Sequence, residues 1–405
     1  MKSVEEQLKI IRRGIAAIFP EEELILRLER SLREGLPLRV KFGIDPTASD
    51  IHLGHTVCLR KLKDFQALGH DALLIIGDFT ALVGDPSGRE KTRPQLTSEE
   101  VEANARTYLE QVSKILDTKR LKIVRNSDWF GNFKFRDVIE LASKMTVARL
   151  LERDDFSNRF KSEVPISLHE FFYPLMQGYD SVMVRSDIEL GGTEQTFNLL
   201  VGRNLQKESG MDGQIALTMP ILVGTDGSER MSKSLGNYIG IAESPSNIYG
   251  KVMSIPDDLM RGYFELLTDV PREELRDLVS PTAHPMEAKK RLARELVSTY
   301  HTPEAAARAE EEFEKVFTRK ELPDEIEPVY IPSSLVKDGK VWAVKLILTA
   351  RMAPSGSEAR RLIAQGGVTL DGEKISDPDA SVEIRPGMVL KVGKRKFARL
   401  FLKEG

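Results

Sequence analysis

The chain has 405 residues, more than one ordinary hydrophobic core accommodates, and this length predicts two or three domains. With 41% hydrophobic and 30% charged residues it has the composition of a globular protein, and no apolar run approaches the length that crosses a bilayer. The single cysteine, Cys58, excludes an intrachain disulfide and a thiolate metal cluster. The acidic start is unlike a signal peptide, so we expect a cytoplasmic protein that does not enter the membrane.

Strands and helices alternate in the first part of the chain. Residues 38–44 alternate between apolar and polar side chains, as a strand does, and residues 72–78 form an apolar run of the length typical of a buried parallel strand. We expect a helix between them over 57–68, a second helix over 98–117 and another strand over 121–124. This order predicts an α/β fold with a Rossmann-like parallel sheet, whose ligands bind beyond the carboxyl ends of the strands.

Two changes of composition divide the rest of the chain. We expect a Rossmann-like domain over residues 1–241, an α-helical domain over 242–332 and a small α+β domain over 333–405. From Val341 onward, twelve lysines and arginines stand against seven acidic residues, so this tail has a local charge of +5. A basic module on a chain whose net charge is −3 predicts a nucleic acid partner.

Two histidines near the first strand predict a phosphate site. His52 and His55 lie one helical turn apart, with Gly54 between them. Their imidazoles can donate hydrogen bonds from one face of a helix start to a phosphate that approaches the glycine backbone closely. Two other interpretations remain open. The histidines could cap or pack the helix, or they could bind a metal ion, although no acidic or cysteine ligand accompanies them at the usual spacing.

Cations and a carboxylate are predicted in two loops. Residues 230–234, Arg-Met-Ser-Lys-Ser, read as a loop, and Lys233 has the character of a mobile cation that could meet the same phosphate. Asp85 follows the second strand, with Arg89 and Arg93 close behind it. A solvated basic loop is one interpretation, but a carboxylate beyond the end of a sheet strand is also placed to hold a ligand ammonium.

A polar stripe runs along one predicted helix. Tyr173, Gln177 and Asp180 are spaced to share one helix face amid aromatic and apolar neighbours. Buried polar groups must be paired, so the stripe predicts a small polar ligand, unless the three side chains bond one another or face water. Gly192 and Glu194 follow a further strand, where the backbone can approach a ligand and the carboxylate can accept from a ribose hydroxyl.

Taken together, these sites resemble one family. Over essentially its whole length the chain is similar to the class I aminoacyl-tRNA synthetases, and within them to the bacterial tyrosyl-tRNA synthetases. The resemblance implies that L-tyrosine is activated with ATP and passed to the terminal ribose of tRNA(Tyr), with Mg²⁺ accompanying the ATP and no dedicated metal site. It also implies a catalytic domain with a dimer-interface insertion near residues 129–160, a helical domain that meets the anticodon, an S4-like RNA-binding tail and a homodimer.

The resemblance assigns roles to individual residues. The catalytic residues that it implies are His52, His55, Arg230 and Lys233. The ATP-binding residues are Asp45, Thr47, Gly54, Arg89, Arg93, Gly192, Glu194, Met231 and Ser232. The tyrosine-binding residues are Lys41, Asp85, Asn126, Tyr173, Gln177, Asp180 and Gln195. The RNA-binding residues are Arg360, Arg361, Lys394, Arg395 and Lys396.

Three positions depart from the family pattern. Lys41 stands where many members have a tyrosine that contacts the phenol of the substrate, Arg230 replaces the usual lysine, and Glu194 replaces the common aspartate. Arginine keeps the charge of lysine but not its geometry. Asp180 is the implied acceptor for the phenol hydroxyl, and a pocket that bonds this hydroxyl rejects phenylalanine, a selectivity for which tyrosyl-tRNA synthetases are themselves a usual example.

Three other functions remain to be compared with tyrosine activation. Tryptophanyl-tRNA synthetases share both phosphate motifs, but the polar stripe and the S4-like tail favour tyrosine. A small nucleotidyltransferase would not need the 230–234 loop or an RNA module. A synthetase-derived RNA-binding protein without catalysis would not need His52, His55, Lys233 and Asp85 together.

Overall fold

The computed structural model describes residues 1–405 except 88–95, 281–282, 318–321, 323–325, 394–395 and 404–405. The chain forms two compact units, Met1–Ala306 and Ala307–Gly405. Among the residues described, no helix combines the length and the apolar character that crossing a membrane requires.

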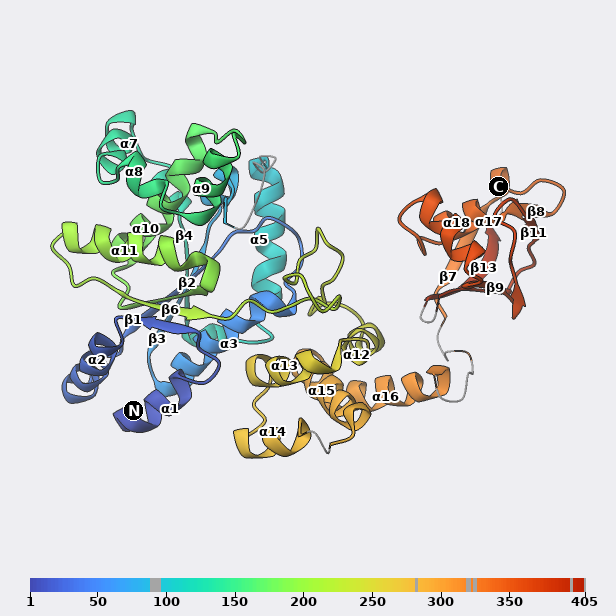
Figure 1. Ribbon diagram of the computed structural model, residues 1–405, viewed down its shortest axis with the longest axis horizontal. Helices are drawn as coiled ribbons and strands as arrows, with labels where there is room; N and C mark the ends of the chain where they lie inside the picture. Colours follow the sequence, from blue (N-terminus) through green and yellow to red (C-terminus); the bar gives the residue numbers. More distant parts are fainter. Residues whose placement is uncertain (88–95, 281–282, 318–321, 323–325, 394–395, 404–405) are drawn as a thin grey trace. The chain divides into compact units, whose positions relative to one another are not determined.

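A six-stranded sheet forms the centre of the first unit (Figure 1). The strand order is β1-β6-β5-β2-β3-β4, and all neighbours are parallel except β1, which runs antiparallel to β6 at the edge. The strands are β1 (Ala17–Phe19), β2 (Arg39–Ile44), β3 (Asp71–Ile76), β4 (Leu121–Arg125), β5 (Ile188–Gly192) and β6 (Ile215–Met219). The predicted α/β class and the three predicted strands are therefore confirmed.

Helices cover both faces of this sheet. Helix α3 (Leu53–Leu68) connects β2 to β3 on one face, and α11 (Thr196–Glu208) connects β5 to β6 on the other (Figure 1). Gly69 ends α3 in the left-handed conformation, with φ at 94°. The other helices beside the sheet are α1 (Val4–Ile11), α2 (Glu21–Glu34), α4 (Thr80–Val83), α5 (Ser98–Val112) and α10 (Phe172–Val184).

Helix α5 is shorter than its sequence pattern predicts. It begins at Ser98, where the side chain of Thr97 caps the Glu100 N–H, but it ends at Val112 rather than at Asp117. The N–H groups of Ile115 and Leu116 both donate to the Val112 carbonyl, so the chain turns out of the helix there and leads into β4.

The strand order reverses between β2 and β5. The chain proceeds from β2 to β3 and β4 in one direction, and from β5 to β6 in the other. In an open parallel sheet such a reversal leaves a crevice beyond the carboxyl ends of the two strands, where ligands bind. Asp45 directly follows β2 and Glu194 follows β5, so the fold brings predicted site residues to this crevice.

Two further groups of helices belong to the first unit. Helices α6 (Ser127–Phe130), α7 (Phe135–Ala142), α8 (Val147–Leu150) and α9 (Asp154–Lys161) lie between β4 and α10. After β6 come α12 (Pro245–Met253), α13 (Met260–Leu267), α14 (Arg272–Leu278) and α15 (Pro285–Tyr300), and α16 (Pro303–Phe317) crosses the boundary between the units. The Tyr300 hydroxyl donates to Thr56 Oγ1 at 3.1 Å and so ties α15 to α3.

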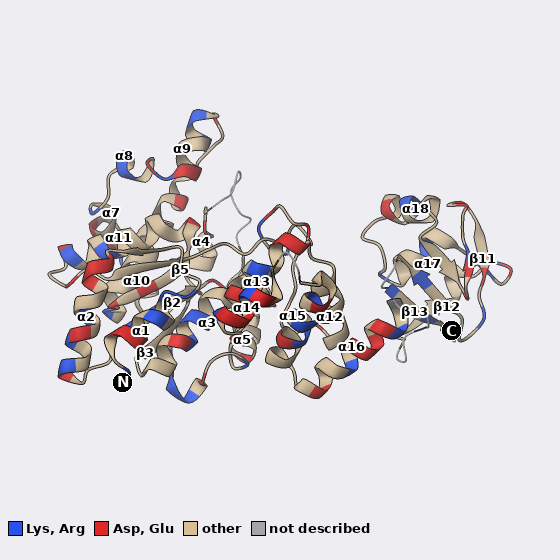
Figure 2. Cartoon of the chain, turned by 60° about the horizontal axis from the view of Figure 1, so that its bottom comes forward, with Lys and Arg blue, Asp and Glu red and all other residues tan. Residues whose placement is uncertain are grey.

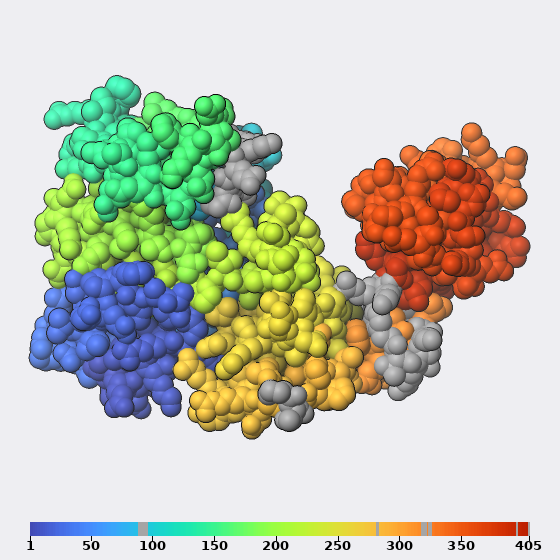
Figure 3. Space-filling model, viewed as in Figure 1, coloured from blue at the N-terminus to red at the C-terminus, as the bar shows by residue number. Residues whose placement is uncertain are grey.

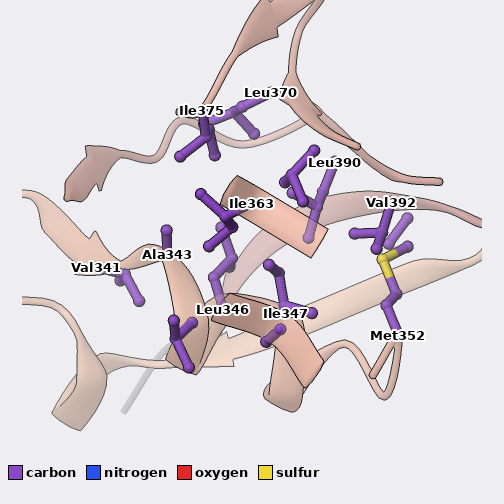
Figure 4. Close-up of a cluster of buried hydrophobic side chains, with 14 of the residues drawn as sticks. Val341, Ala343, Leu346, Ile347, Met352, Ile363, Leu370, Ile375, Leu390 and Val392 are labelled. Carbon is purple, nitrogen blue, oxygen red and sulfur yellow. The ribbon is translucent and has the colours of Figure 1, made fainter. Parts of the chain in front are cut away.

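The second unit has its own core, between two helices and a five-stranded sheet (Figure 4). Helices α17 (Ala343–Thr349) and α18 (Gly356–Ala364) contribute Leu346, Ile347 and Ile363, which pack against Leu390. The sheet order is β10-β9-β12-β13-β7, from β7 (Pro328–Pro332), β9 (Val368–Leu370), β10 (Glu373–Lys374), β12 (Val389–Val392) and β13 (Lys396–Lys403). A separate pair joins β8 (Lys340–Trp342) to β11 (Ser381–Glu383).

The predicted boundary at residue 333 leaves β7 outside this sheet. In the structure β7 pairs in parallel with β13, so the sheet of the second unit includes residues 328–332. The pairing joins segments far apart in sequence, which the local pattern does not reveal. The division of the first unit near residue 242 stays a prediction.

Candidate active site

A cavity of about 290 Å³ opens at the strand reversal, and it gathers most of the predicted site. Its walls come from the ends of β2, β3 and β5, the first turn of α3, one face of α10 and the loop after β6. The predicted residues that line it are Asp45, Thr47, His52, Gly54, His55, Asp85, Tyr173, Gln177, Asp180, Gly192, Glu194, Gln195, Arg230, Met231 and Ser232. Two phosphate motifs and the polar stripe therefore share one cavity.

The two histidines hold each other at the start of α3. His52 is the N-cap residue, and its Nδ1 accepts from the Gly54 N–H at 3.2 Å, while the His52 N–H donates to His55 Nδ1 at 3.3 Å. The rings stack with centroids 3.8 Å apart. A Cβ on residue 54 would lie 3.0 Å from the His52 ring, a tight contact that the glycine avoids.

This geometry sets the proton on each imidazole. Because both Nδ1 atoms accept a backbone N–H, the neutral rings carry their hydrogen on Nε2 and can donate it to a ligand. Burial lowers the pKa of His52 to about 2, and the charges of His55 and Lys233 add to the effect. The helix-capping interpretation is therefore correct for His52 and is compatible with phosphate binding, because capping occupies only Nδ1.

The 230–234 loop is folded against the same helix start. The Met231 N–H donates to the Leu222 carbonyl at 2.8 Å, and the Ser232 N–H donates to Asn237 Oδ1 at 2.8 Å. Met231 is buried against the cavity. The Lys233 ammonium lies 3.5 Å from Asp50 Oδ2, outside the cavity lining, and burial lowers its pKa. The loop thus presents Arg230 to the cavity and holds Lys233 beside it.

Asp45 is held by two hydroxyl groups. Thr80 Oγ1 donates to Asp45 Oδ1 at 2.8 Å, and the Tyr173 hydroxyl donates to Asp45 Oδ2 at 2.9 Å. A Cβ on Gly77 would lie 2.0 Å from Asp45 Oδ1, so this approach also requires a glycine. Asp45 therefore orients Tyr173 within the cavity.

A chain of amides links Asp85 to helix α10. Gln195 Nε2 donates to Asp85 Oδ2 at 2.9 Å, and Asn198 Nδ2 donates to both Gln195 Oε1 and Gln177 Oε1 at 2.9 Å. Arg153 closes the network from behind, with Nη1 2.9 Å from Asn198 Oδ1 and Nη2 3.7 Å from Asp85 Oδ1. Because each amide is fixed by the next, the acceptors that face the cavity are pre-oriented.

Asp180 ends the polar stripe in a fully buried position. Trp129 Nε1 donates to Asp180 Oδ1 at 3.0 Å, and Asn126 Nδ2 approaches Oδ2 at 3.3 Å. Burial raises the pKa of Asp180 to about 7, and the nearby charge of Lys41 is the largest effect that opposes the rise. The stripe bonds to other elements rather than to itself, so the interpretation as a ligand-binding face is the one that its contacts favour.

Glu194 sits at the turn after β5. Its carboxylate lies so close to Gly192 that a Cβ there would be 2.3 Å from Oε2. Burial raises the pKa of Glu194, Asp85 adds to the rise, and the positive charge of Arg230 opposes it. Both residues line the cavity, and Arg230 is close enough to Glu194 to affect its pKa.

Several predicted residues do not line the cavity. Lys41 and Asn126 are completely buried behind it, where Lys41 pairs with Glu189 and Asn126 bonds Asp180 and Thr80, and Lys233 lies beside it. The roles of Lys41 and Asn126 in tyrosine binding stay predictions. Arg89, Arg93, Lys394 and Arg395 lie outside the described residues.

Four further residues with polar groups build the site and were not predicted from the sequence: Thr80, Trp129, Asn198 and Glu189. Thr80 and Trp129 follow the carboxyl ends of β3 and β4, the same signal that singled out Asp85. Asn198 gives no comparable signal, because it stands on α11 among apolar residues. Glu189 is a charge within an apolar strand, which is unusual enough to have predicted a buried partner.

Of the predicted RNA-binding residues, the three that the structure describes are exposed in the second unit: Arg360, Arg361 and Lys396. Figure 2 shows basic and acidic residues together on α18. The Arg360 guanidinium lies 5.2 Å from the Trp342 ring centroid and 2.8 Å from Asp379, and Arg361 pairs with Glu358 at 2.6 Å. Lys396 Nζ donates to the Met352 carbonyl at 2.6 Å.

Comparison with known proteins agrees with this geometry. A family model described as "tRNA synthetases class I (W and Y)" matches residues 33–318, and an S4 domain model matches residues 341–390. The chain is 58% identical to the tyrosine-tRNA ligase of Moorella thermoacetica over 403 residues, 98% of this chain and 96% of that protein. The chain belongs to the bacterial tyrosyl-tRNA synthetase family. The tyrosine-tRNA ligase of Thermotoga maritima is 52% identical over 400 residues, covering 98% of this chain and 97% of the relative.

A solved structure places the fold in the same family. The crystal structure of tyrosyl-tRNA synthetase complexed with L-tyrosine from Archaeoglobus fulgidus matches with a TM-score of 0.63 and 25% identity, over 76% of this chain and 99% of that chain. The S4 match confirms the predicted class of the tail. Both relatives are named tyrosine-tRNA ligases, and each match covers nearly the full length of the relative. This favours tyrosine over tryptophan as the amino acid.

Proposed function

We propose that the chain activates L-tyrosine with ATP, forming tyrosyl-adenylate and pyrophosphate, and then transfers tyrosine to the terminal ribose of tRNA(Tyr). The observation that carries this proposal is the cavity, in which a buried carboxylate at Asp180 and an ammonium-binding set around Asp85 share space with the His52 and His55 pair. No other function weighed against it needs all three features in one cavity.

Tyrosine is bound at both ends. Asp85, Tyr173 and Gln177 hold the substrate ammonium, because they offer a carboxylate and two oxygen acceptors on one wall. Asp180 accepts the phenol hydroxyl. Gln195 contributes from the cavity wall by orienting Asp85, whereas Asn126 acts through Asp180.

The chemistry requires no covalent enzyme intermediate. The tyrosine carboxylate is ionised at neutral pH, so one of its oxygens attacks the α-phosphorus of ATP while the bond to the pyrophosphate oxygen breaks. His52 and His55 donate from Nε2 to the phosphates, because each Nδ1 accepts a backbone N–H. The low pKa of His52 leaves it neutral at physiological pH, and the neutral ring is still a donor at Nε2. Glu194 accepts from the ribose, and the backbone at Gly54 and Gly192 permits close approach.

Two cations neutralise the pyrophosphate as it leaves. Arg230 lines the cavity, and Lys233 is held by Asp50 until it swings onto the phosphates. The pair with Asp50 is half exposed and long, so it is easily exchanged for a phosphate. Mg²⁺ would be brought by ATP, on whose phosphates it would neutralise part of the charge.

The second unit is the RNA-binding part. Arg360, Arg361 and Lys396 are exposed, and their present acidic or carbonyl partners can be exchanged for RNA phosphates. We expect the protein to act in the cytoplasm. These assignments predict that tRNA binding weakens as salt rises.

The protein is expected to act as a homodimer through residues 129–160. This segment forms one extremity of the first unit (Figure 3) and carries Phe135, Ile139, Val147 and Phe160, which are 80%, 55%, 60% and 65% exposed. Exposed apolar clusters of this kind mark protein interfaces. A second copy of the chain is the partner that the family resemblance implies.

Pyrophosphate exchange with each amino acid in turn tests the proposed function. Labelled pyrophosphate should enter ATP only when L-tyrosine is present, and the protein should then charge tRNA(Tyr). Exchange that depends on tryptophan, or no exchange with any amino acid, would contradict the proposal.

A further inference from the structure

Two opposite charges are buried in the centre of the sheet, behind the cavity. Lys41 of β2 and Glu189 of β5 are register partners in neighbouring parallel strands, and both are 0% exposed. Lys41 Nζ lies 2.9 Å from Glu189 Oε1. Burying such a pair is unfavourable unless every remaining donor and acceptor is also satisfied, so its surroundings decide its role.

Most of the other side-chain hydrogen bonds of the pair go to helix α10. Lys41 Nζ donates to the Gln177 carbonyl at 3.0 Å and to Ser181 Oγ at 2.7 Å. Glu189 accepts from Gln177 Nε2 at 3.3 Å and from Ser181 Oγ at 3.0 Å. The pair therefore holds, by hydrogen bonds, the turn of α10 from which Gln177 and Asp180 face the cavity.

The neighbouring helix is shaped to leave room for this network. Gln214 Nε2 also donates to Glu189 Oε2. A Cβ on Gly202 of α11 would lie 2.6 Å from Gln214 Nε2, 2.9 Å from Ser181 Oγ and 3.3 Å from Glu189 Oε2. A side chain at position 202 would therefore force Gln214 and Ser181 to shift, so the glycine supports both the packing of α10 on α11 and the hydrogen bonds of the ion pair.

The pair also acts on Asp180 by charge. Lys41 of β2 is the principal charge that favours the ionised form of Asp180, whereas Glu189 of β5 disfavours it more weakly. Asn126 and Trp129, from the segment after β4, donate to the carboxylate and stabilise its charge. The two charged groups thus act on Asp180 in opposite directions.

We propose that the Lys41–Glu189 pair makes the cavity selective for the phenol of tyrosine: it fixes the α10 turn that presents Gln177 and Asp180, and the Lys41 ammonium favours the charged form of Asp180, which is the better acceptor. Neither residue touches the substrate, so both are positioning residues. The proposal rests on the proposed role of Asp180 as the phenol acceptor. It explains why a lysine can stand where many relatives place a phenol-contacting tyrosine.

The test uses opposite charge changes within the pair. The ratio of kcat/KM for tyrosine to that for phenylalanine is measured by pyrophosphate exchange between pH 5.5 and 9, which cancels pH effects common to both amino acids. In the unchanged protein this ratio should fall on acidification with a midpoint near 7, as Asp180 gains a proton. Lys41→Met should move the midpoint up by about one pH unit, and Glu189→Gln should move it down.

A double variant keeps the test decisive if Lys41→Met does not fold. Lys41→Met combined with Glu189→Gln leaves no unpaired buried charge, and its midpoint should still rise, because Lys41 has the larger effect on Asp180. The matched control is Arg159→Met with Glu170→Gln, another buried ion pair, whose Nη1–Oε2 distance is 2.6 Å. Its midpoint should stay where it is in the unchanged protein.

The outcomes separate this inference from the proposed function. No exchange with tyrosine in the unchanged protein would contradict the proposed function itself. Exchange with tyrosine together with a pH-independent ratio, or with midpoints that move in the same direction in both single variants, would overturn the role of the pair. A purely structural role would lower rates without moving the midpoint.

Discussion

Replacing Asp180 by asparagine should stabilise the free protein and lower its selectivity for tyrosine. Burial raises the pKa of Asp180 to about 7 from 3.8, so the folded protein holds a proton that the unfolded chain releases. The free energy of unfolding therefore decreases as the pH rises from about 4 to about 7, and the full penalty remains above pH 7. Three pKa units correspond to about 4 kcal/mol.

Part of the stability gained by removing the buried charge is lost, because the new amide cannot accept both of the present hydrogen bonds. Asp180 now accepts from both Trp129 and Asn126, and either orientation of the new amide turns its NH₂ group toward one of these donors. A buried donor without an acceptor costs about 1–3 kcal/mol, so the net gain at pH 8 should be about 1–3 kcal/mol. The lost hydrogen bond between a phenol and a charged carboxylate, about 1.5–3 kcal/mol, should lower the tyrosine to phenylalanine ratio roughly 10- to 150-fold.

Two assays on one variant check this reasoning. Denaturant unfolding of Asp180→Asn and of the unchanged protein at pH 8 and pH 5 gives the stability difference, which should be smaller at pH 5. Pyrophosphate exchange gives kcat/KM for each amino acid. Asp128→Asn, at an exposed carboxylate nearby, is the control and should change neither quantity. Unchanged selectivity would refute the assignment. It would also be refuted if the variant's gain in the free energy of unfolding over the unchanged protein were smaller at pH 8 than at pH 5.

Four further predictions concern other parts of the protein. Lys233→Ala should lower the single-turnover rate of adenylate formation and leave ATP affinity nearly unchanged, as rapid quench can show; weaker ATP binding at a normal rate would contradict its role. Removal of the residues after Phe317 should preserve pyrophosphate exchange and impair tRNA charging, and loss of both would mean that the second unit is structural. Burial lowers the pKa of His70 to about 4, so stability should be complete above pH 6.5 and fall by up to about 3 kcal/mol as pH drops toward 4, a slope that His70→Gln should remove in urea titrations. Phe135→Glu with Ile139→Glu should shift the protein from dimer to monomer in analytical ultracentrifugation, and an unchanged sedimentation coefficient would place the interface elsewhere.

The parallel sheet was predictable because its signals are local. Apolar runs, turn residues and the glycine at the end of α3 each act within a few positions of the chain, and the three predicted strands occur where expected. Tyr173, Gln177 and Asp180 could be assigned to one helix face for the same reason. The pairing of β7 with β13 could not be predicted, because it depends on contact between distant segments.

The arrangement behind the cavity depends on strand order. Lys41 and Glu189 are recognisable as charges in apolar strands, but only the adjacency of β2 and β5 makes them partners. The family pattern indicated that position 41 contacts the phenol, yet the buried pair holds the lysine away from the cavity. In the same way, the sequence pointed to the histidines but not to the use of Nδ1 for capping, which leaves Nε2 as the donor.

A crystal structure with a non-hydrolysable tyrosyl-adenylate analogue tests the central assignment most directly. We predict that the phenol oxygen lies within hydrogen-bond distance of Asp180, that the ammonium lies between Asp85, Tyr173 and Gln177, and that the analogue's α-phosphate group faces the His52 and His55 end of the cavity. A phenol ring that points away from Asp180, or an analogue bound outside this cavity, would contradict the account.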